Sequence, residues 1–110
     1  MKIGYKGFDS NLCAGLGSAK KQEFVIGETY TKLSKEKPVV CSSDGFHYCD
    51  DLVTVFSHYP LERGNRFCEV EILGDFTDSS DKSITTSLRI VRELEKEEIY
   101  KHVYEENLNI

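Results

Sequence analysis

Two cysteines and a histidine stand close together in the middle of the chain. Cys41, His47 and Cys49 fall within nine residues, around an Asp44-Gly45 pair that favours a turn. Because side chains two residues apart lie on one face of an extended strand, we expect His47 and Cys49 to point the same way. Thiolates and imidazoles are ligands that Zn²⁺ prefers. This segment therefore predicts part of a zinc site.

A closed structural zinc site has four ligands, so one more residue is required. Cys13 lies in a polar, glycine-rich stretch, where a thiol has little reason to pack. Cys68 alternates with Val70 and Ile72, so we expect it in the core and keep it only as a reserve ligand. The spacing lacks the Cys-x2-Cys unit of common zinc sites, and four reduced cysteines without a metal are the alternative. The predicted ligand set is Cys13, Cys41, His47 and Cys49.

The predicted ion has a structural role. Four protein ligands leave no open position for a reactive water, which a catalytic zinc site keeps. Ser43, Asp44 and His47 stand too close in sequence to take the three roles of a catalytic triad. We therefore expect that the protein is not an enzyme and that Zn²⁺ stabilises its fold.

The elements that position these residues are short and alternate between strand and helix patterns. Residues 67–73 and 84–90 show the two-residue alternation of half-buried strands. Asp50 and Asp51 suit a helix start, and Pro60 ends that segment. Further strands are expected at 1–8, at 23–30 with a turn or bulge at Gly27, and at 39–41, with a closing helix from 94. The pattern predicts an α+β fold: a mostly antiparallel sheet, one short central helix and a C-terminal helix, held together by the zinc.

Length and composition limit the possible classes of protein. The 110 residues fit a single domain, 1–110, and 39% hydrophobic residues suffice for one small core. The apolar runs are too short for a transmembrane helix or a signal peptide, so we expect a cytoplasmic protein without membrane contact, present as a monomer. Its net charge of −5 argues against direct nucleic-acid binding.

Charge is distributed unevenly along the sequence. Residues 1–37 carry seven lysines against four carboxylates, a net charge of +3. Residues 38–110 carry seven basic and fifteen acidic residues, a net charge of −8. This asymmetry predicts either a solvated surface with a modest bias or an acidic face that meets a basic partner.

Several motifs together resemble a domain of unknown function from phages and bacteria. They are Tyr5-Lys-Gly-Phe8, Cys13, Phe24-x2-Gly27-x2-Tyr30, Cys41-x3-Gly45-Phe-His-x-Cys49, Arg66-Phe-x-Glu-Val-Glu71 and Lys82-Ser-x6-Ile90. The resemblance covers nearly the whole chain. It implies that Cys13, Cys41, His47 and Cys49 form a metal or structural cluster, to which a thiol at position 68 does not belong.

The chain is also similar to zinc-containing anti-CRISPR proteins that inhibit type II-A Cas9. That resemblance implies a phage protein that binds host Cas9 by protein–protein contact and blocks the loading of nucleic acid or target binding. Cas9 presents basic surfaces to nucleic acid, and an acidic protein can be steered onto them. The residues we expect at such a contact are Glu69, Glu71, Glu93, Glu95, Glu97 and Glu98.

Two other functions remain open from the sequence. One is a zinc-stabilised structural or housekeeping module of a phage, without a host target. The other is a small metal-dependent hydrolase, which would need an open position on the metal and a deep pocket.

Overall fold

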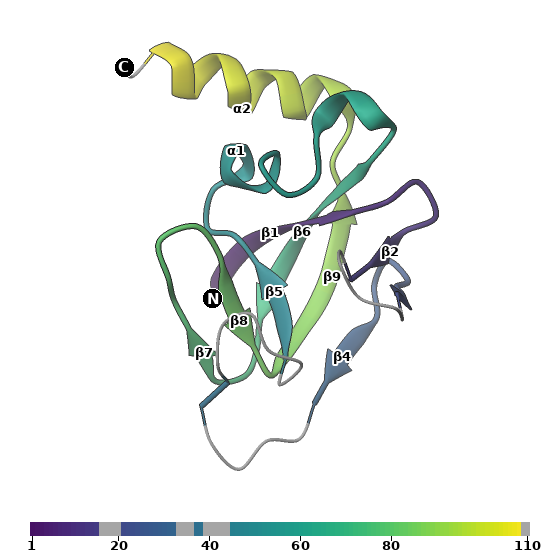
Figure 1. Ribbon diagram of the computed structural model, residues 1–110, viewed down its shortest axis with the longest axis vertical. Helices are drawn as coiled ribbons and strands as arrows, with labels where there is room; N and C mark the ends of the chain where they lie inside the picture. Colours follow the sequence, from purple (N-terminus) through teal and green to yellow (C-terminus); the bar gives the residue numbers. More distant parts are fainter. Residues whose placement is uncertain (16–20, 33–36, 39–44, 109–110) are drawn as a thin grey trace.

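The computed structural model describes residues 1–15, 21–32, 37–38 and 45–108 of the chain (Figure 1). Its helices are α1 (Leu52–Val55) and α2 (Lys96–Leu108), with one 3₁₀ turn at Leu61–Arg63. Its strands are β1 (Lys2–Phe8), β2 (Cys13–Ala14), β3 (Gln22–Glu23), β4 (Thr29–Thr31), β5 (Phe46–Tyr48), β6 (Arg66–Ile72), β7 (Phe76–Thr77), β8 (Ser83–Thr85) and β9 (Ser87–Glu93). No helix in this described part of the chain is long and apolar enough to cross a membrane.

The strands form two main sheets and one short hairpin. The larger sheet has the order β1-β6-β9-β4 and the smaller one the order β5-β8-β7, while β2 pairs with β3. Every pairing between these strands is antiparallel. The α+β fold predicted from the sequence is therefore confirmed, with its short central helix and its C-terminal helix.

The first core fills the space between the two sheets. β6 and β9 contribute Val70, Leu88 and Ile90, each 0% exposed, and β5 contributes Phe46 and Tyr48. Alternation along each strand turns these side chains to one face of the sheet.

The second core lies at the other end of the molecule, under the two helices. Phe67 of β6 contacts a cluster that includes Leu52 and Val55 of α1 and Ile99 of α2. Figure 1 shows α1 and α2 gathered at this end, with the smaller sheet at the opposite end. The helices therefore leave the far end of the sheets uncovered by helix.

One predicted strand is divided in two. Residues 83–85 pair in the smaller sheet, whereas residues 87–93 pair in the larger one. Thr85 lies at the division, where its Oγ1 lies 3.0 Å from the Asp75 carbonyl and 3.1 Å from the Ser87 carbonyl. Sequence alternation continues through the division, so it could not reveal that the chain passes from one sheet to the other.

The other predicted elements agree only in part with the observed ones. The helix expected between Asp50 and Pro60 is only four residues long, with Asp51 as an N-cap whose side chain makes no capping hydrogen bond. The expected turn at Gly27 is present, with a positive φ of 92°. The strand predicted at 39–41 lies outside the described residues.

Candidate functional site

Lys6 occupies a position on the inner face of the larger sheet. Its register partner in β6 is Cys68, which is 0% exposed, and the next inward residue along β1 is Phe8, also 0% exposed. Lys6 itself is only 8% exposed. A lysine thus stands where the strand pattern calls for an apolar side chain, and burying its charge is costly unless partners compensate.

The Lys6 ammonium contacts the edge of β5. Its Nζ donates a hydrogen bond of 2.5 Å to the carbonyl oxygen of His47. The same Nζ lies 5.8 Å from the centre of the Phe8 ring and 5.6 Å from that of Phe24, within range of cation–π attraction. These neighbours are a carbonyl dipole and two ring faces, none of which carries a full negative charge.

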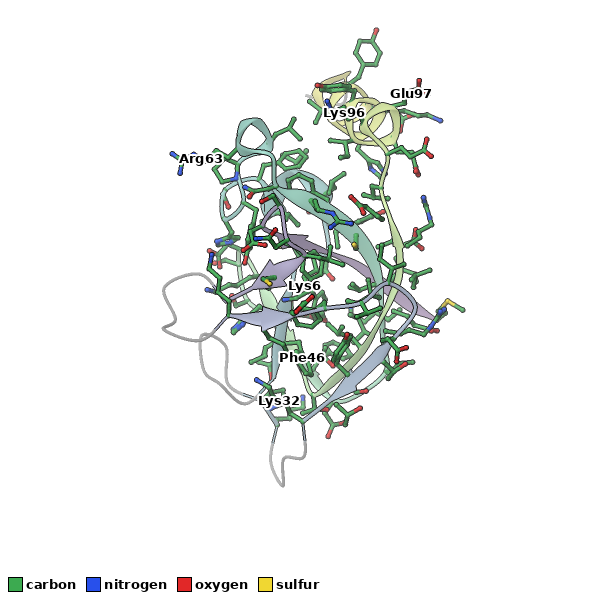
Figure 2. The ribbon with its side chains drawn as sticks, turned by 90° about the vertical axis from the view of Figure 1, so that its right-hand side faces the viewer. Lys6, Lys32, Phe46, Arg63, Lys96 and Glu97 are labelled. Atoms are coloured by element: carbon green, nitrogen blue, oxygen red, sulfur yellow. The ribbon has the colours of Figure 1, made fainter. Side chains whose placement is uncertain are left out.

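The Lys32 ammonium also lies near a backbone carbonyl and an aromatic ring at β5. Its Nζ lies 3.5 Å from the carbonyl oxygen of Gly45 and 5.0 Å from the centre of the Phe46 ring. Backbone carbonyls two residues apart in a strand point to the same edge of that strand. The ammonium groups of Lys6 and Lys32 therefore lie along the same edge of β5. Figure 2 shows Lys6, Phe46 and Lys32 following one another in the same half of the molecule, away from Lys96 and Glu97 on α2.

The imidazole of His47 is subject to the charges of these basic side chains. Burial, followed by the charges of Lys6, Lys82 and Lys32 and then His58, lowers the pKa of His47 to about 4. Its imidazole is therefore neutral at pH 7. We call Lys6, Lys32, His47 and Lys82 the basic cluster; apart from Lys6, its members are half-buried.

Two lysines of the basic cluster, Lys6 and Lys82, differ from other lysines of the protein in their ion pairing. Among the described residues, no carboxylate forms an ion pair with Lys6 or Lys82, whereas Lys2 pairs with Asp50 and Lys21 with Asp9. Burial lowers the pKa of Lys6 to about 8, with Cys49 raising it and Lys32 lowering it. Lys6 is thus still mostly charged at neutral pH, which makes the cluster electropositive in a protein of net charge −5.

The predicted zinc ligands that the structure describes come from two segments of the chain, β2 and the segment at β5. Cys13 in β2 is half-buried, and its Sγ donates to the Asn11 carbonyl at 3.7 Å. Cys49, 5% exposed, follows β5, and its Sγ donates to the Asp81 carbonyl at 3.4 Å. His47 and Cys49 lie two residues apart in extended backbone, as expected, while Cys41 lies outside the described residues.

The structure leaves the four-ligand set as a prediction. In the segments that it describes, no group of three or more His, Cys, Asp or Glu residues could hold a metal ion. Burial and then Asp81 raise the pKa of Cys49 to about 11, and partial burial followed by Asp9 raises the pKa of Cys13. As placed, both groups are protonated thiols, so a metal would have to displace their protons.

Cys68 is a core residue, as the sequence predicted. It is fully buried in the middle of β6, and burial raises its pKa to about 12. Its surroundings are the apolar side chains of the first core. The thiol therefore acts as a small hydrophobic group.

A hollow of about 170 Å³ lies between the segment around β2 and the segment that joins α1 to β6. One of its lining residues is His58, which is also among the charges that act on His47. The hydroxyl of Tyr59 in the same lining accepts a hydrogen bond of 3.3 Å from the Gly15 amide. The lining residues are Asp9, Cys13, Lys21, His58, Tyr59, Pro60, Arg63 and Asn65.

The glutamates proposed as an acidic contact surface are mostly bound to arginines. Arg92 forms ion pairs with Glu69 at 3.0 Å and with Glu98 at 2.8 Å. Arg89 pairs with Glu71 at 3.5 Å, and Arg66 with Glu93 at 2.5 Å. Only Glu95 and Glu97, of the six, have no ion pair within the part of the chain that the structure describes. The outer face of β6 and β9 thus has alternating charges.

Sequence reasoning did not single out Lys6. The signal was present, because strand alternation over residues 1–8 puts Lys6 on the same side as Phe8. Lys2 lies on that side as well, but it is the first residue of the strand, where a charged side chain reaches solvent easily. The convergence of Lys32 and Lys82 on β5 depends on the sheet order and had no sequence signal.

Residues 2–102 match the family DUF7666, a domain of unknown function. No curated protein and no solved structure matches the chain. These comparisons leave Cas9 inhibition and the alternatives to it as predictions.

Proposed function

The chain belongs to the DUF7666 family, and we propose that it is a binding module for a small phosphate-bearing ligand, held by the basic cluster. The observation that carries the proposal is the buried Lys6 ammonium, hydrogen-bonded to a backbone carbonyl and without a carboxylate partner in the described chain. A buried cation of this kind is compensated fully only when an anion joins it.

The carbonyls that the two ammonium groups approach have a spacing that suits a tetrahedral oxyanion bound between the lysines. These carbonyls, of Gly45 and His47, are two residues apart, which a strand separates by about 7 Å. Two charge-assisted hydrogen bonds of about 2.8 Å, together with roughly 2.5 Å between two phosphate oxygens, span a similar distance. Phosphate carries up to two negative charges and accepts from several donors, so it satisfies more than one lysine at once.

Protection of a free sheet edge is a weaker explanation for Lys6. Lysines that guard an edge strand against unwanted pairing hold their charge in water. Lys6 has its charge inside the protein, at 8% exposure. This placement favours a binding role over an edge-guarding one.

Isothermal titration with inorganic phosphate tests the proposal. We expect saturable binding to the wild type, weakened about 10- to 100-fold by Lys6→Met, because a hydrogen bond to a charged group contributes roughly 1.5–3 kcal/mol. Lys32→Met provides a second reading if Lys6→Met does not fold. Absence of saturable phosphate binding to the folded wild type would overturn the proposal.

Lys2→Met is the matched control. Lys2 lies on the same strand, and its Nζ is 4.7 Å from the centre of the Phe76 ring, so it repeats the lysine–aromatic contact. It differs in having a carboxylate partner, Asp50, at 3.5 Å. We expect phosphate affinity to be unchanged in this variant. An equal loss in Lys2→Met and Lys6→Met would show that phosphate responds only to overall charge.

A further inference from the structure

The C-terminal helix α2 carries two exposed tyrosines on its solvent side. Tyr100 is 59% exposed and Tyr104 is 64% exposed, whereas Ile99 of the same helix is buried in the second core. Residues four apart lie one turn above each other on the same face of a helix, so the two tyrosines form a continuous aromatic strip. Exposed apolar side chains that stand singly are ordinary, but a strip of two large rings indicates a contact surface.

This side of α2 is free of other described elements. Figures 1 and 2 both show α2 at one end of the molecule, with no other helix or strand of the described chain beyond it. Lys101 and Glu105 follow the two tyrosines along the helix, and their side chains are 75% and 59% exposed. We call Tyr100, Lys101, Tyr104 and Glu105 the α2 face.

The α2 face is complementary to itself. In two antiparallel copies related by a twofold axis, residues at equal distances on either side of the axis face each other. An axis near residue 102 brings Tyr100 of each copy against Tyr104 of the other. Lys101 and Glu105 have the same four-residue spacing, one residue further along the helix, which is a shift of only about 1.5 Å. The same arrangement therefore brings each Lys101 close to Glu105 of the other copy.

We propose that α2 forms the interface of a weak homodimer, in which two α2 faces pack antiparallel, in place of the monomer expected from the sequence. A partner of uniform charge fits this face less well, because it would be repelled by either Lys101 or Glu105. Four exposed tyrosine rings would remove roughly 500 Å² from water. Interfaces that bury less than about 1,200 Å² in total are typical of weak complexes.

Sedimentation equilibrium of the full chain, between about 10 μM and 1 mM, measures the association. We expect a monomer–dimer equilibrium with a Kd of about 0.1–1 mM. Tyr104→Ser should weaken it at least about tenfold, because a tyrosine at the centre of an interface contributes much of the binding. Leu73→Ser is the matched control: Leu73 is 51% exposed but lies outside α2, so its loss should leave the Kd unchanged.

Charge variants test the antiparallel arrangement even if Tyr104→Ser does not fold. Lys101→Glu and Glu105→Lys should each be monomeric alone, because each brings like charges together across the interface. An equimolar mixture of the two variants should dimerise, since opposite charges then face each other. A wild type that stays monomeric up to about 1 mM would overturn the proposal. Dimers that persist in all three variants would also overturn it, because another surface would then form the contact.

This proposal is independent of phosphate binding. The α2 face contributes no residue to the basic cluster, so a protein without phosphate affinity can still form the dimer. Phosphate titration and sedimentation therefore test the two proposals separately.

Discussion

At the scale of single residues, Lys6 combines a cost in stability with the role proposed for it in binding. Burial lowers its pKa to about 8, so the folded protein binds this proton less tightly than the unfolded chain does. A lysine with an unperturbed pKa near 10.4 therefore loses roughly 3 kcal/mol of folding free energy when it stays charged in such a place. Functional sites concentrate perturbed groups of this kind.

We expect Lys6→Met to be as stable as the wild type or more stable at pH 7, by up to about 3 kcal/mol. The methionine fills similar space without a charge. As the pH rises through 8 towards 10, the folded wild type sheds the Lys6 proton before the unfolded chain does, so its free energy of unfolding rises relative to the variant. Urea unfolding at pH 7 and pH 10 measures the difference. A variant that is less stable at both pH values would contradict this account.

The cysteines show how far residue types alone can be interpreted. Alternation with Val70 and Ile72 identified Cys68 as a core group, because burial on one face of a strand is a local property. For Cys13 and Cys49 the sequence predicted metal ligands, but their surroundings depend on contacts between distant segments. The thiol of Cys49, for example, donates to Asp81, which lies on a different loop.

At the scale of elements, the join between β5 and β8 holds the basic cluster in place. Gly45 precedes β5, and a Cβ added there would lie 2.3 Å from the Thr85 carbonyl oxygen. Since that atom belongs to the backbone of β8, it cannot move without disturbing the sheet. Gly45 also supplies the carbonyl near which the Lys32 ammonium lies.

Gly45→Ala should therefore destabilise the fold by about 1–3 kcal/mol and weaken phosphate binding as well. Gly27→Ala is the comparison, because a Cβ at Gly27 would meet nothing within 4 Å and its cost comes only from the positive φ of 92°. That cost is about 1 kcal/mol, without loss of phosphate binding. Urea unfolding and phosphate titration of both variants test the contrast. Equal losses of affinity would contradict the role given to Gly45.

Element types could be predicted from this sequence better than their partners could. The α+β fold and the C-terminal helix followed from local periodicity. The division of residues 84–90 between two sheets did not, because Ile84, Leu88 and Ile90 are buried alike on both sides of it. The basic cluster was missed for the same reason: its lysines come from three segments that meet only once the sheets have formed.

At the scale of the whole molecule, the net charge of −5 is the sum of two regions whose local charges differ. On the outer face of β6 and β9, glutamates alternate with arginines and largely neutralise one another. At the edge of β5, basic groups gather without a carboxylate partner for Lys6 or Lys82 in the described chain. Local charge, which decides what a site binds, thus has the opposite sign to the total.

The predicted zinc site offers a competing reason for this positive charge. If Cys13, Cys41, His47 and Cys49 held Zn²⁺, their thiolates would carry negative charge that Lys6 and Lys32 could balance. Structural zinc contributes about 10–16 kcal/mol of apparent binding free energy, which couples to folding. The two explanations therefore predict different effects of metal removal on stability and on anion binding.

Metal analysis of the untagged protein, with melting curves before and after a chelator, separates them. The zinc prediction expects about one zinc per chain and a melting temperature that falls on chelation and in Cys49→Ser. In the control Cys68→Ser the zinc content should be kept, although a hydroxyl in the core lowers the melting temperature. If the metal-free protein keeps both its melting temperature and its phosphate affinity, the zinc prediction is wrong and the positive charge belongs to the anion site. If chelation unfolds the protein and phosphate does not bind the zinc-loaded form, the lysines balance thiolates instead.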